Sequence, residues 1–258
     1  MILATWNVNS VRARIGVVER WLRRRKPTVL CMQETKVQDD LFPAEVFEDL
    51  GYHLVLNGQK TWNGVALASL AEPDDVTTGL PTGFLAEQKR IITATVSGFR
   101  ISCVYVPNGG EVGSERFRDK LAFLEQLVEM ADVEGGGLPY VMAGDFNVAP
   151  GDDDVFDPAL LEGAVCFHPE ERSRMRGLVA SGLTDLFRSF NPAGKAYSWW
   201  DYREAGFRRD RGMRLDHVLA GREAAALCEG CAVDREPRSW EKPSDHTPVV
   251  AVFRDPGE

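Results

Sequence analysis

The chain has 258 residues, of which 44% are hydrophobic and 27% are charged, a composition typical of a globular protein with a full hydrophobic core. Its formal net charge of −9 argues against a protein that coats nucleic acid through general positive charge. A nucleic-acid enzyme stays compatible with this charge, because a metal site concentrates acidic residues locally. No apolar run reaches the roughly 18 residues that a membrane-spanning helix needs, so we expect no membrane contact.

The ends and the cysteines indicate a reduced compartment. Met1 leads directly into a strand-like run without a charged and then apolar leader, so we expect no secretion. The five cysteines are odd in number, scattered and partly within apolar runs, which predicts reduced thiols in a cytoplasm. Cys228 and Cys231 form one CxxC motif. A zinc site would need a second pair, and a lone CxxC without further context is a weak redox motif, so we expect neither role.

Hydrophobic periodicity predicts strands and helices in turn along the first half of the chain. Apolar residues from Ile15 to Leu22 recur at helical spacing, and Pro27 stops that helix. The Asn57-Gly58 turn signal stands between two strand-like runs. The other expected elements are strands over 2–8, 28–32, 53–56 and 64–68, and a short helix over 43–50.

The second half continues the same mixture. Two strands, 90–96 and 100–106, are expected to form a hairpin through Ser97-Gly98. A helix over 114–133, with Ser114 as its cap, is expected to break at Gly135-Gly136-Gly137. The remaining expected elements are strands over 139–143, 215–220 and 249–253, and a helix over 170–179. The pattern predicts one α/β domain over residues 1–258, with mixed sheets covered by helices.

Acid and amide residues follow several of these apolar runs. Asp145 and Asn147 alternate around Phe146, which places both on one face, where a carboxylate can accept a proton from water and an amide can hold a phosphate oxygen. Glu34 ends a buried strand and suits a magnesium ion. Asn7 and Asn9 share a face after the first strand. The alternatives are turn hydrogen bonds for the amides and Asp145, and a surface loop for Glu34.

An acid within an apolar strand points to an ionic partner. Asp216 lies between Leu215 and His217, and such a buried carboxylate needs a cation or a donor. His246, next to Asp245 before the last strand, is the natural candidate, because a carboxylate fixes the imidazole tautomer and raises its basicity. His217 points to the opposite face and is interpreted as structural. His53 and His168 are interpreted as ordinary polar histidines.

Aromatic residues stand beside arginines near position 200. Tyr105, at a strand end, can donate to a phosphate oxygen, although a core-edge tyrosine is the alternative. Residues 197–202 hold two tryptophans and two tyrosines and precede the arginine-rich segment 203–214, a pattern suited to stacking on bases or sugars. A core tryptophan with surface arginines is the alternative there. Asp152-Asp153-Asp154 is interpreted as a solvated acidic loop.

These segments together resemble the exonuclease III family of apurinic/apyrimidinic endonucleases, within the endonuclease/exonuclease/phosphatase superfamily. The resemblance covers nearly the whole chain and implies a four-layer α/β sandwich, in which two packed mainly antiparallel or mixed sheets are flanked by helices. The matching segments, in chain order, are Thr5-Trp6-Asn7-Val8-Asn9, Gln33-Glu34-Thr35-Lys36, Trp62-Asn63-Gly64-Val65-Ala66, Tyr105-Val106-Pro107-Asn108-Gly109, Gly144-Asp145-Phe146-Asn147, Trp199-Trp200-Asp201-Tyr202, Gly212-Met213-Arg214-Leu215-Asp216 and Ser244-Asp245-His246.

The resemblance also implies roles for individual residues. Glu34 and Asp245 would hold Mg²⁺ or Mn²⁺, with Asn7, Asp145 and Asn147 also in the metal site. Asp145 would activate the attacking water. The residues expected to position water and phosphate are Asn7, Asn147, Tyr105 and His246, with Asp216 orienting the histidine. The residues expected to contact DNA are Trp199, Leu215 and Met213 at the baseless sugar, and Asn108, Arg12, Arg208 and Arg211.

The expected function is a DNA-repair phosphodiesterase that cleaves 5′ to abasic sites in double-stranded DNA, with 3′-to-5′ exonuclease and 3′-phosphatase activity. We expect a cytoplasmic monomer that associates with the nucleoid by binding DNA. Two departures from the family pattern are Asn9, where some relatives carry Asp, and Arg172, within a segment where many carry an aromatic residue. The alternatives are a phosphoesterase for phospholipids or inositol phosphates, and a DNA-end-binding protein with a decayed site.

Overall fold

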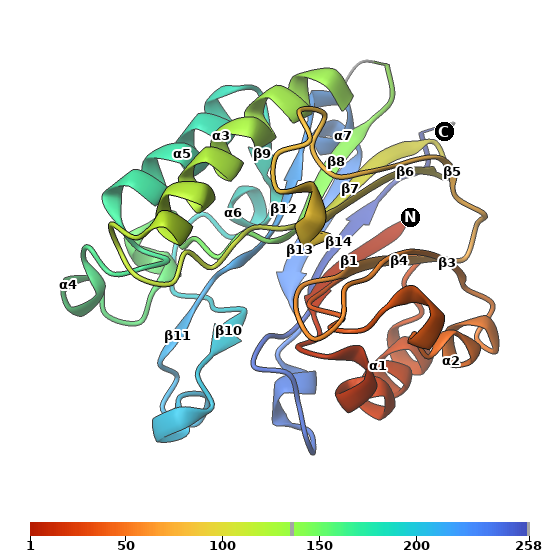
Figure 1. Cartoon of the computed structure of the whole chain (residues 1–258), viewed down its shortest axis with the longest axis horizontal. Coiled ribbons are helices and arrows are strands. Elements are labelled where there is room, and N and C mark those ends of the chain that lie inside the picture. The colour runs from red at the N-terminus through yellow and green to blue at the C-terminus, as the bar shows by residue number, and fades with distance from the viewer. Residues whose placement is uncertain (135–136, 257–258) are drawn as a thin grey trace.

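Two six-stranded β-sheets pack face to face, and helices cover their outer sides (Figure 1). This is a computed structural model, and it describes residues 1–134 and 137–256. Helices α1 and α2 lie on one side of the sandwich and α3 and α5 on the other, while both termini lie at one end. The prediction of a four-layer α/β sandwich is confirmed.

The first sheet has the strand order β13-β14-β1-β2-β4-β3. Its pair β1–β2 is parallel and its other pairs are antiparallel, so the sheet is mixed. Helix α1 crosses over between the two parallel strands. The strands are β1 (Ile2–Asn7), β2 (Val29–Gln33), β3 (His53–Asn57), β4 (Val65–Ser69), β13 (Cys228–Val233) and β14 (Val249–Phe253).

The second sheet has the order β5-β6-β7-β8-β12-β9, with β7–β8 as its parallel pair. The predicted hairpin is confirmed: β6 and β7 pair antiparallel through Ser97 and Gly98, whose φ angles of 50° and 77° fit the tight turn that such a hairpin requires. The strands are β5 (Asp74–Thr78), β6 (Ile91–Val96), β7 (Phe99–Tyr105), β8 (Tyr140–Asp145), β9 (Thr184–Asp185) and β12 (Asp216–Ala220).

The helices begin and end where local chemistry directs them. Helix α1 is capped by Ser10, whose hydroxyl accepts a hydrogen bond from Ala13 N at 3.4 Å, and it ends at Lys26 in the left-handed region before Pro27. The expected glycine break after α3 falls partly on residues 135–136, outside the described residues. The helices are α1 (Val11–Arg25), α2 (Ala44–Glu48), α3 (Glu115–Glu134), α4 (Pro158–Leu161), α5 (Pro169–Ala180), α6 (Leu186–Phe190) and α7 (Arg222–Leu227).

The main core lies between the two sheets. Leu3 and Cys31 of the first sheet and Ile101 and Val218 of the second belong to one fully buried cluster. Separate clusters join α1 and α2 to the first sheet and α3 and α5 to the second. Each fully buried side chain of this size contributes on the order of 2 kcal/mol, so the sandwich holds the strand ends in fixed positions.

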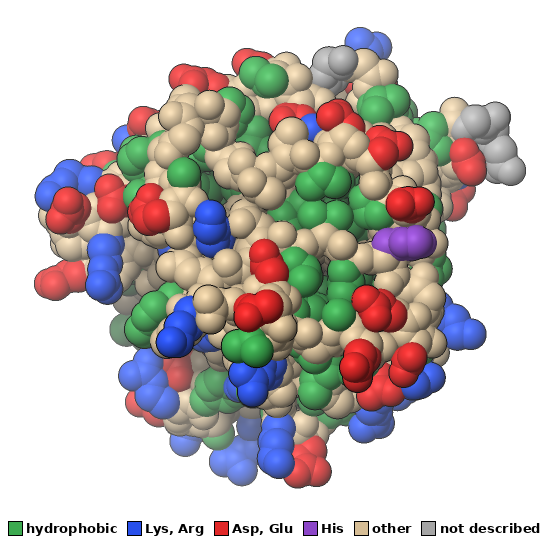
Figure 2. Space-filling model, turned by 45° about the vertical axis from the view of Figure 1, so that its right-hand side comes forward, with side chains coloured by type: hydrophobic (Ala, Val, Ile, Leu, Met, Phe, Trp, Pro, Cys, Tyr) green, Lys and Arg blue, Asp and Glu red, His purple; other side chains and the backbone are tan. Residues whose placement is uncertain are grey.

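A small hairpin leaves the sandwich at one end. It consists of β10 (Trp199–Trp200) and β11 (Gly212–Met213), joined through a short 3-10 helix at Arg203–Ala205. In Figure 1 this hairpin extends downward beside the segment that carries the 3-10 helix Glu236–Ser239. On the face in Figure 2, most visible Lys and Arg side chains lie in the lower half, toward this end, while Asp and Glu are scattered. On this face the positive charge is therefore unevenly distributed.

A buried ionic network corrects the interpretation of Asp154 and Arg214, while Asp152 and Asp153 are exposed as expected. Asp154 is 2% exposed and Arg214 1%, so neither lies in a solvated loop or on a basic surface. Arg214 Nε donates to Asp154 Oδ1 at 2.6 Å and its Nη2 donates to Asp185 Oδ2 at 2.7 Å. His217 lies in the same network, with Nδ1 2.9 Å from Arg214 Nη1 and Nε2 2.8 Å from Val148 O. A carbonyl only accepts, so Nε2 carries the proton and His217 is neutral, in the structural role expected.

His217 is expected to make the protein sensitive to acid. Burial, and then the charge of Arg214, lower its pKa from 6.5 to about 4, so the unfolded chain binds the proton more readily. Stability is therefore lost as the pH falls through this window, by roughly 3 kcal/mol from this group. His217→Gln keeps one donor and one acceptor but cannot be protonated. Urea unfolding at several pH values should show a flatter acid limb for this variant.

His53→Gln, at an exposed position on β3, is the matched control and should leave the acid limb unchanged. Equal acid limbs in the wild type and His217→Gln would show that the buried imidazole does not govern acid stability.

Candidate active site

The expected site residues lie at the ends of neighbouring strands. Asn7 ends β1 and Glu34 directly follows β2, which is parallel to β1. Tyr105 and Asp145 end the parallel strands β7 and β8 and are paired in register. Asp216 begins β12, antiparallel to β8, and is paired with Asp145. The topology therefore brings six separate chain segments, including the loop that carries His246, to one end of the sandwich.

Asp145 is a fully buried acid of the group. Its side chain accepts hydrogen bonds from Asn7 Nδ2 at 2.8 Å and from the backbone N of Asn147 at 2.9 Å. Asn7 Nδ2 also donates to Glu34 Oε1 at 2.7 Å, so one amide joins both carboxylates. Burial raises the pKa of Asp145 to about 7, with Asp216 adding to the rise while His246 opposes it. A carboxyl group poised near neutrality can accept a proton from water.

Asp216 and His246 form the predicted pair. His246 Nδ1 lies 2.8 Å from Asp216 Oδ2, and its Nε2 lies 3.8 Å from Asp145 Oδ2, so the ring stands between two acids. Burial lowers the pKa of His246, but the Asp216 and Asp145 carboxylates outweigh it and raise the pKa to about 10. The imidazole is therefore cationic at neutral pH and can donate from Nε2.

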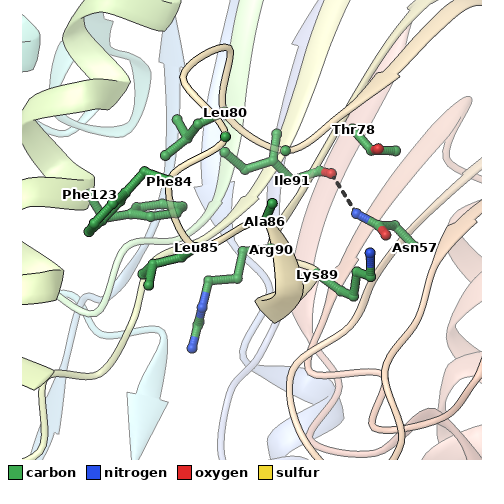
Figure 3. Close-up of a pocket in the computed structure, with 12 residues that line it drawn as sticks. Asn57, Thr78, Leu80, Phe84, Leu85, Ala86, Lys89, Arg90, Ile91 and Phe123 are labelled. Atoms are coloured by element: carbon green, nitrogen blue, oxygen red, sulfur yellow. Dashed lines mark hydrogen bonds between the residues drawn. The ribbon is translucent and has the colours of Figure 1, made fainter.

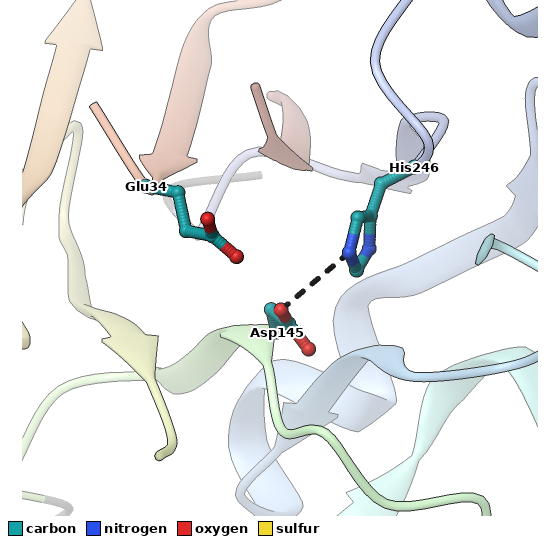
Figure 4. A group of neighbouring side chains, drawn as sticks. All are labelled: Glu34, Asp145 and His246. Carbon is teal, nitrogen blue, oxygen red and sulfur yellow. Dashed lines mark ion pairs between the residues drawn. The ribbon is translucent and has the colours of Figure 1, made fainter. Parts of the chain in front are cut away.

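Glu34, Asp145 and His246 lie close together (Figure 4), and the two carboxylates can hold a metal ion, because both nitrogens of the cationic imidazole carry protons. One ligand atom from each lies within 4.8 Å of the others. Burial alone would raise the pKa of Glu34, but the Lys36 ammonium at 2.8 Å, together with the hydrogen bond from Asn7, lowers it. Two carboxylates beside a solvent-reachable position fit the oxygen ligands that Mg²⁺ prefers.

Asp245 lies beside this group rather than in it. Its Oδ1 accepts from Asn9 Nδ2 at 2.9 Å and its Oδ2 accepts from Trp199 Nε1 at 3.1 Å. Asn9 Oδ1 in turn accepts from Lys36 Nζ at 2.6 Å. Each carboxylate oxygen of Asp245 thus has a donor from the protein, as both oxygens of Glu34 do, and the role of Asp245 as a metal ligand stays a prediction.

Tyr105 and Asn147 face the acids from the second sheet. Burial, then the charges of Glu34 and Asp145, raise the pKa of Tyr105 well above its usual value, so the phenol keeps its proton. The Arg90 guanidinium lies 4.7 Å from the centre of its ring. Asn147 Oδ1 accepts from Asn108 Nδ2 at 3.1 Å, and its Nδ2 donates to Val106 O at 3.0 Å. The two loops therefore hold each other.

Lys120 is a residue that the sequence interpretation missed. Its fully buried ammonium donates to Asn147 O at 2.7 Å and to Asn108 O at 3.0 Å, and it forms an ion pair with the equally buried Glu171. The cation thus supports both loops from behind the acids. The available signal was its position on α3, on the apolar side that also carries Phe117 and Leu124.

The expected DNA-contacting residues comprise a pocket-lining set and an exposed set. Trp199 and Met213 pack against buried Leu215 and line a hollow of about 400 Å³. Asn108, Arg12, Arg208 and Arg211 are exposed, and Arg211 lies 3.5 Å from Glu204. Arg172 is tied down by Asp152 at 2.9 Å and lies over the Phe167 ring.

Two further hollows flank the site. One, of about 420 Å³, is lined by Tyr105 and Asn108 together with Trp62, which is 67% exposed. The other, of about 180 Å³, lies between Phe123, Leu85 and Lys89 (Figure 3). In it Asn57 Nδ2 donates to Ile91 O at 3.0 Å. Within the described residues, none of the expected site residues lines this second hollow.

Comparison with known protein families identifies the family of this chain. The model of the Endonuclease/Exonuclease/phosphatase family matches residues 4–246. The chain belongs to this family. Among its relatives, Exodeoxyribonuclease III of Haemophilus influenzae is 37% identical over 98% of this chain and 100% of its own. The resemblance inferred from the motifs is confirmed.

Solved structures within the family agree. A 3′ phosphatase from Neisseria bound to a product DNA hairpin has a TM-score of 0.96 and 41% identity, covering 98% of this chain and 99% of its own. An AP endonuclease from Archaeoglobus fulgidus has a TM-score of 0.93 and 41% identity over the same shares. Relatives named for different activities thus share this fold. No helix among the described residues is long and apolar enough to cross a membrane.

Proposed function

We propose that this chain, acting as one domain over residues 1–258, is a Mg²⁺- or Mn²⁺-dependent DNA-repair phosphodiesterase. It cleaves 5′ to abasic sites in double-stranded DNA and also trims 3′ ends as an exonuclease and 3′-phosphatase. The observation that carries the proposal is the buried Asp145 carboxylate, held by Asn7 and Asn147 between Glu34 and His246. The nuclease and 3′-phosphatase names of its relatives support DNA as the substrate.

The side chains divide the reaction between them. Asp145 accepts the proton of the attacking water, and Asn147, held by Val106 and Asn108, orients that water. His246, kept cationic by Asp216, donates to a phosphate oxygen, and Tyr105 donates from the other sheet. A divalent cation held by Glu34, with Asn7, Asp145 and Asn147 near it, would stabilise the negative charge of the phosphate as a Lewis acid.

The surroundings favour an extruded baseless sugar. Trp199, Met213 and Leu215 offer an apolar wall next to His246. Asn108, Arg12, Arg208 and Arg211 are exposed and suit contacts with phosphates. A nucleotide without a base is easily extruded because nothing pairs with it, which supplies selectivity. We further propose a monomer that works in the cytoplasm, on nucleoid DNA.

The test is cleavage of three labelled duplexes, with a tetrahydrofuran abasic analogue, a 3′-phosphate end or no lesion. Incision of the first in Mg²⁺, and none in EDTA, is expected. Binding should weaken steeply with salt, because phosphate contacts release counterions. Cleavage that survives EDTA would contradict the proposed mechanism. Turnover of inositol phosphates with no duplex binding would assign the site to a phosphoesterase, and duplex binding without turnover in any divalent metal would assign it to a lesion-binding protein.

A further inference from the structure

A chain of polar contacts runs from the metal-binding side of the site to the pocket wall. Glu34 Oε2 lies 2.8 Å from Lys36 Nζ, which donates to Asn9 Oδ1 at 2.6 Å. Asn9 Nδ2 donates to Asp245 Oδ1 at 2.9 Å, and Trp199 Nε1 donates to Asp245 Oδ2 at 3.1 Å. We call Glu34, Lys36, Asn9, Asp245 and Trp199 the polar relay.

The direction of every hydrogen bond in the polar relay is fixed. Lys36 and the Trp199 indole only donate, and an ionised Asp245 only accepts. The Asn9 amide can therefore satisfy both neighbours in one orientation alone, with its oxygen toward Lys36 and its NH₂ toward Asp245. Loss of the Lys36 hydrogen bond at one end of the polar relay therefore breaks or reverses the next hydrogen bond, between Asn9 and Asp245.

Trp199 connects the polar relay to the pocket. Its ring lines the hollow of about 400 Å³ together with Phe156 and Met213, and only its indole N–H edge points to Asp245. Its backbone forms a β-bridge with His246, and Trp200 N donates to Asp245 O at 3.0 Å. The pocket wall and the segment that carries His246 therefore form one unit.

We propose that Asp245 is a positioning residue that holds the Trp199 ring in the pocket wall, and that cation binding at Glu34 is coupled to the pocket through the polar relay. A divalent cation beside Glu34 repels the Lys36 ammonium, which frees the Asn9 amide and shifts the charge balance at Asp245. By linkage, filling the pocket changes the affinity for the cation by the same factor. This inference rests on the proposed cation site, but not on the identity of the substrate.

Indole emission provides a readout that does not depend on turnover. Mg²⁺ is titrated into the DNA-free protein, and the same titration of Trp199→Phe is subtracted to isolate the signal of Trp199. We expect a saturable change in the wild type and none in Asn9→Leu, which cuts the polar relay in its middle. Tyr202→Phe is the matched control: Tyr202 follows the same strand but bonds to Arg14 and Pro243, so its loss should leave the signal intact.

An exchange of two side chains tests the hydrogen-bond directions. In Asp245→Asn, two donors, from Asn9 and Trp199, face a single acceptor, so the Trp199 signal should be lost and KM for the abasic duplex should rise several-fold more than kcat falls. Adding Asn9→Asp restores an acceptor toward Lys36 and toward the new amide, whose oxygen can again accept from Trp199. The double variant should recover both the signal and KM.

The outcomes separate this inference from the proposed function. Mg²⁺-dependent cleavage without a Trp199 signal, an unchanged signal in Asn9→Leu, or a double variant no better than Asp245→Asn would each overturn the polar relay and leave the nuclease in place. Absence of cleavage in any divalent metal, with a Trp199 signal that follows Mg²⁺, would overturn the nuclease and support the coupling.

Discussion

Asp145→Asn is expected to remove almost all cleavage of the abasic duplex while the protein still folds. The substitution keeps the size of the side chain but removes the carboxylate that accepts the proton from water. General-base catalysis alone contributes roughly 10²–10⁴-fold, so kcat should fall by about 10³-fold or more. Asp145 is fully buried at the end of β8, and an uncharged side chain of equal volume leaves the core around it filled. Single-turnover rates at saturating enzyme give the measurement.

Asp152→Asn is the matched control, because this exposed acid begins the 3-10 helix Asp152–Asp154 and, among the described residues, forms its ion pair with Arg172 alone. Its cleavage rate should stay within a factor of about two, since an exposed ion pair contributes little. Circular dichroism and a single cooperative unfolding transition establish that both variants fold. An Asp145→Asn enzyme that retained more than a tenth of the wild-type rate would transfer the role of base to another group.

The convergence of the site was predictable from particular residues. Asp216 interrupts an apolar strand, and a buried carboxylate needs a partner, which pointed to His246; the structure places the two 2.8 Å apart. Asp145 and Asn147 alternate around Phe146, and Phe146 is indeed buried while its neighbours face Asn7 and Asn108. Each of these inferences depends on the residue types next to one another at a strand end, and these can be read directly from the sequence.

Contacts between distant segments escaped prediction. Asp154 and Arg214 were interpreted as surface charges. They are ion-pair partners of each other although they lie 60 positions apart, and no local sequence pattern indicates such a pair. Lys120 looked like one polar residue on an amphipathic helix until α3 docked over the carbonyl of Asn147. Strand β5 was missed because all five of its residues are exposed and lack apolar alternation. Strand β13 carries Gly230 at a bulge, which hides its period.

The Lys120 network also explains why Gly109 stands where it does. A Cβ at Gly109 would lie 2.9 Å from Lys120 Cδ, and its φ of 93° is in the region that favours glycine. The loop therefore passes close enough for the buried ammonium to reach both Asn108 O and Asn147 O. The spacing of Tyr105, Asn108 and Gly109 thus allows the loop to contact buried Lys120 on one side while Tyr105 and Asn108 face the site on the other.

Asp216→Asn should lower kcat/KM by roughly 10²-fold at neutral pH and change the shape of the pH profile. Burial alone would lower the pKa of His246, and the Asp216 carboxylate is the first of the groups that raise it to about 10. In the wild type this raised pKa stabilises the fold below the unfolded value of 6.5, and the contribution is lost as the pH rises through about 10. Without the carboxylate, the largest of the charges that oppose burial is gone, so the imidazole loses its proton at a lower pH.

The alkaline limb of kcat/KM for Asp216→Asn is therefore expected to begin well below that of the wild type, which should stay active until the pH approaches about 10. His53→Gln, on the remote strand β3, should reproduce the wild-type profile. A uniform fall in kcat/KM with both profiles parallel would mean that Asp216 only orients the ring. An earlier alkaline limb means that its charge keeps His246 protonated, and this second outcome follows from the two acids on either side of the imidazole.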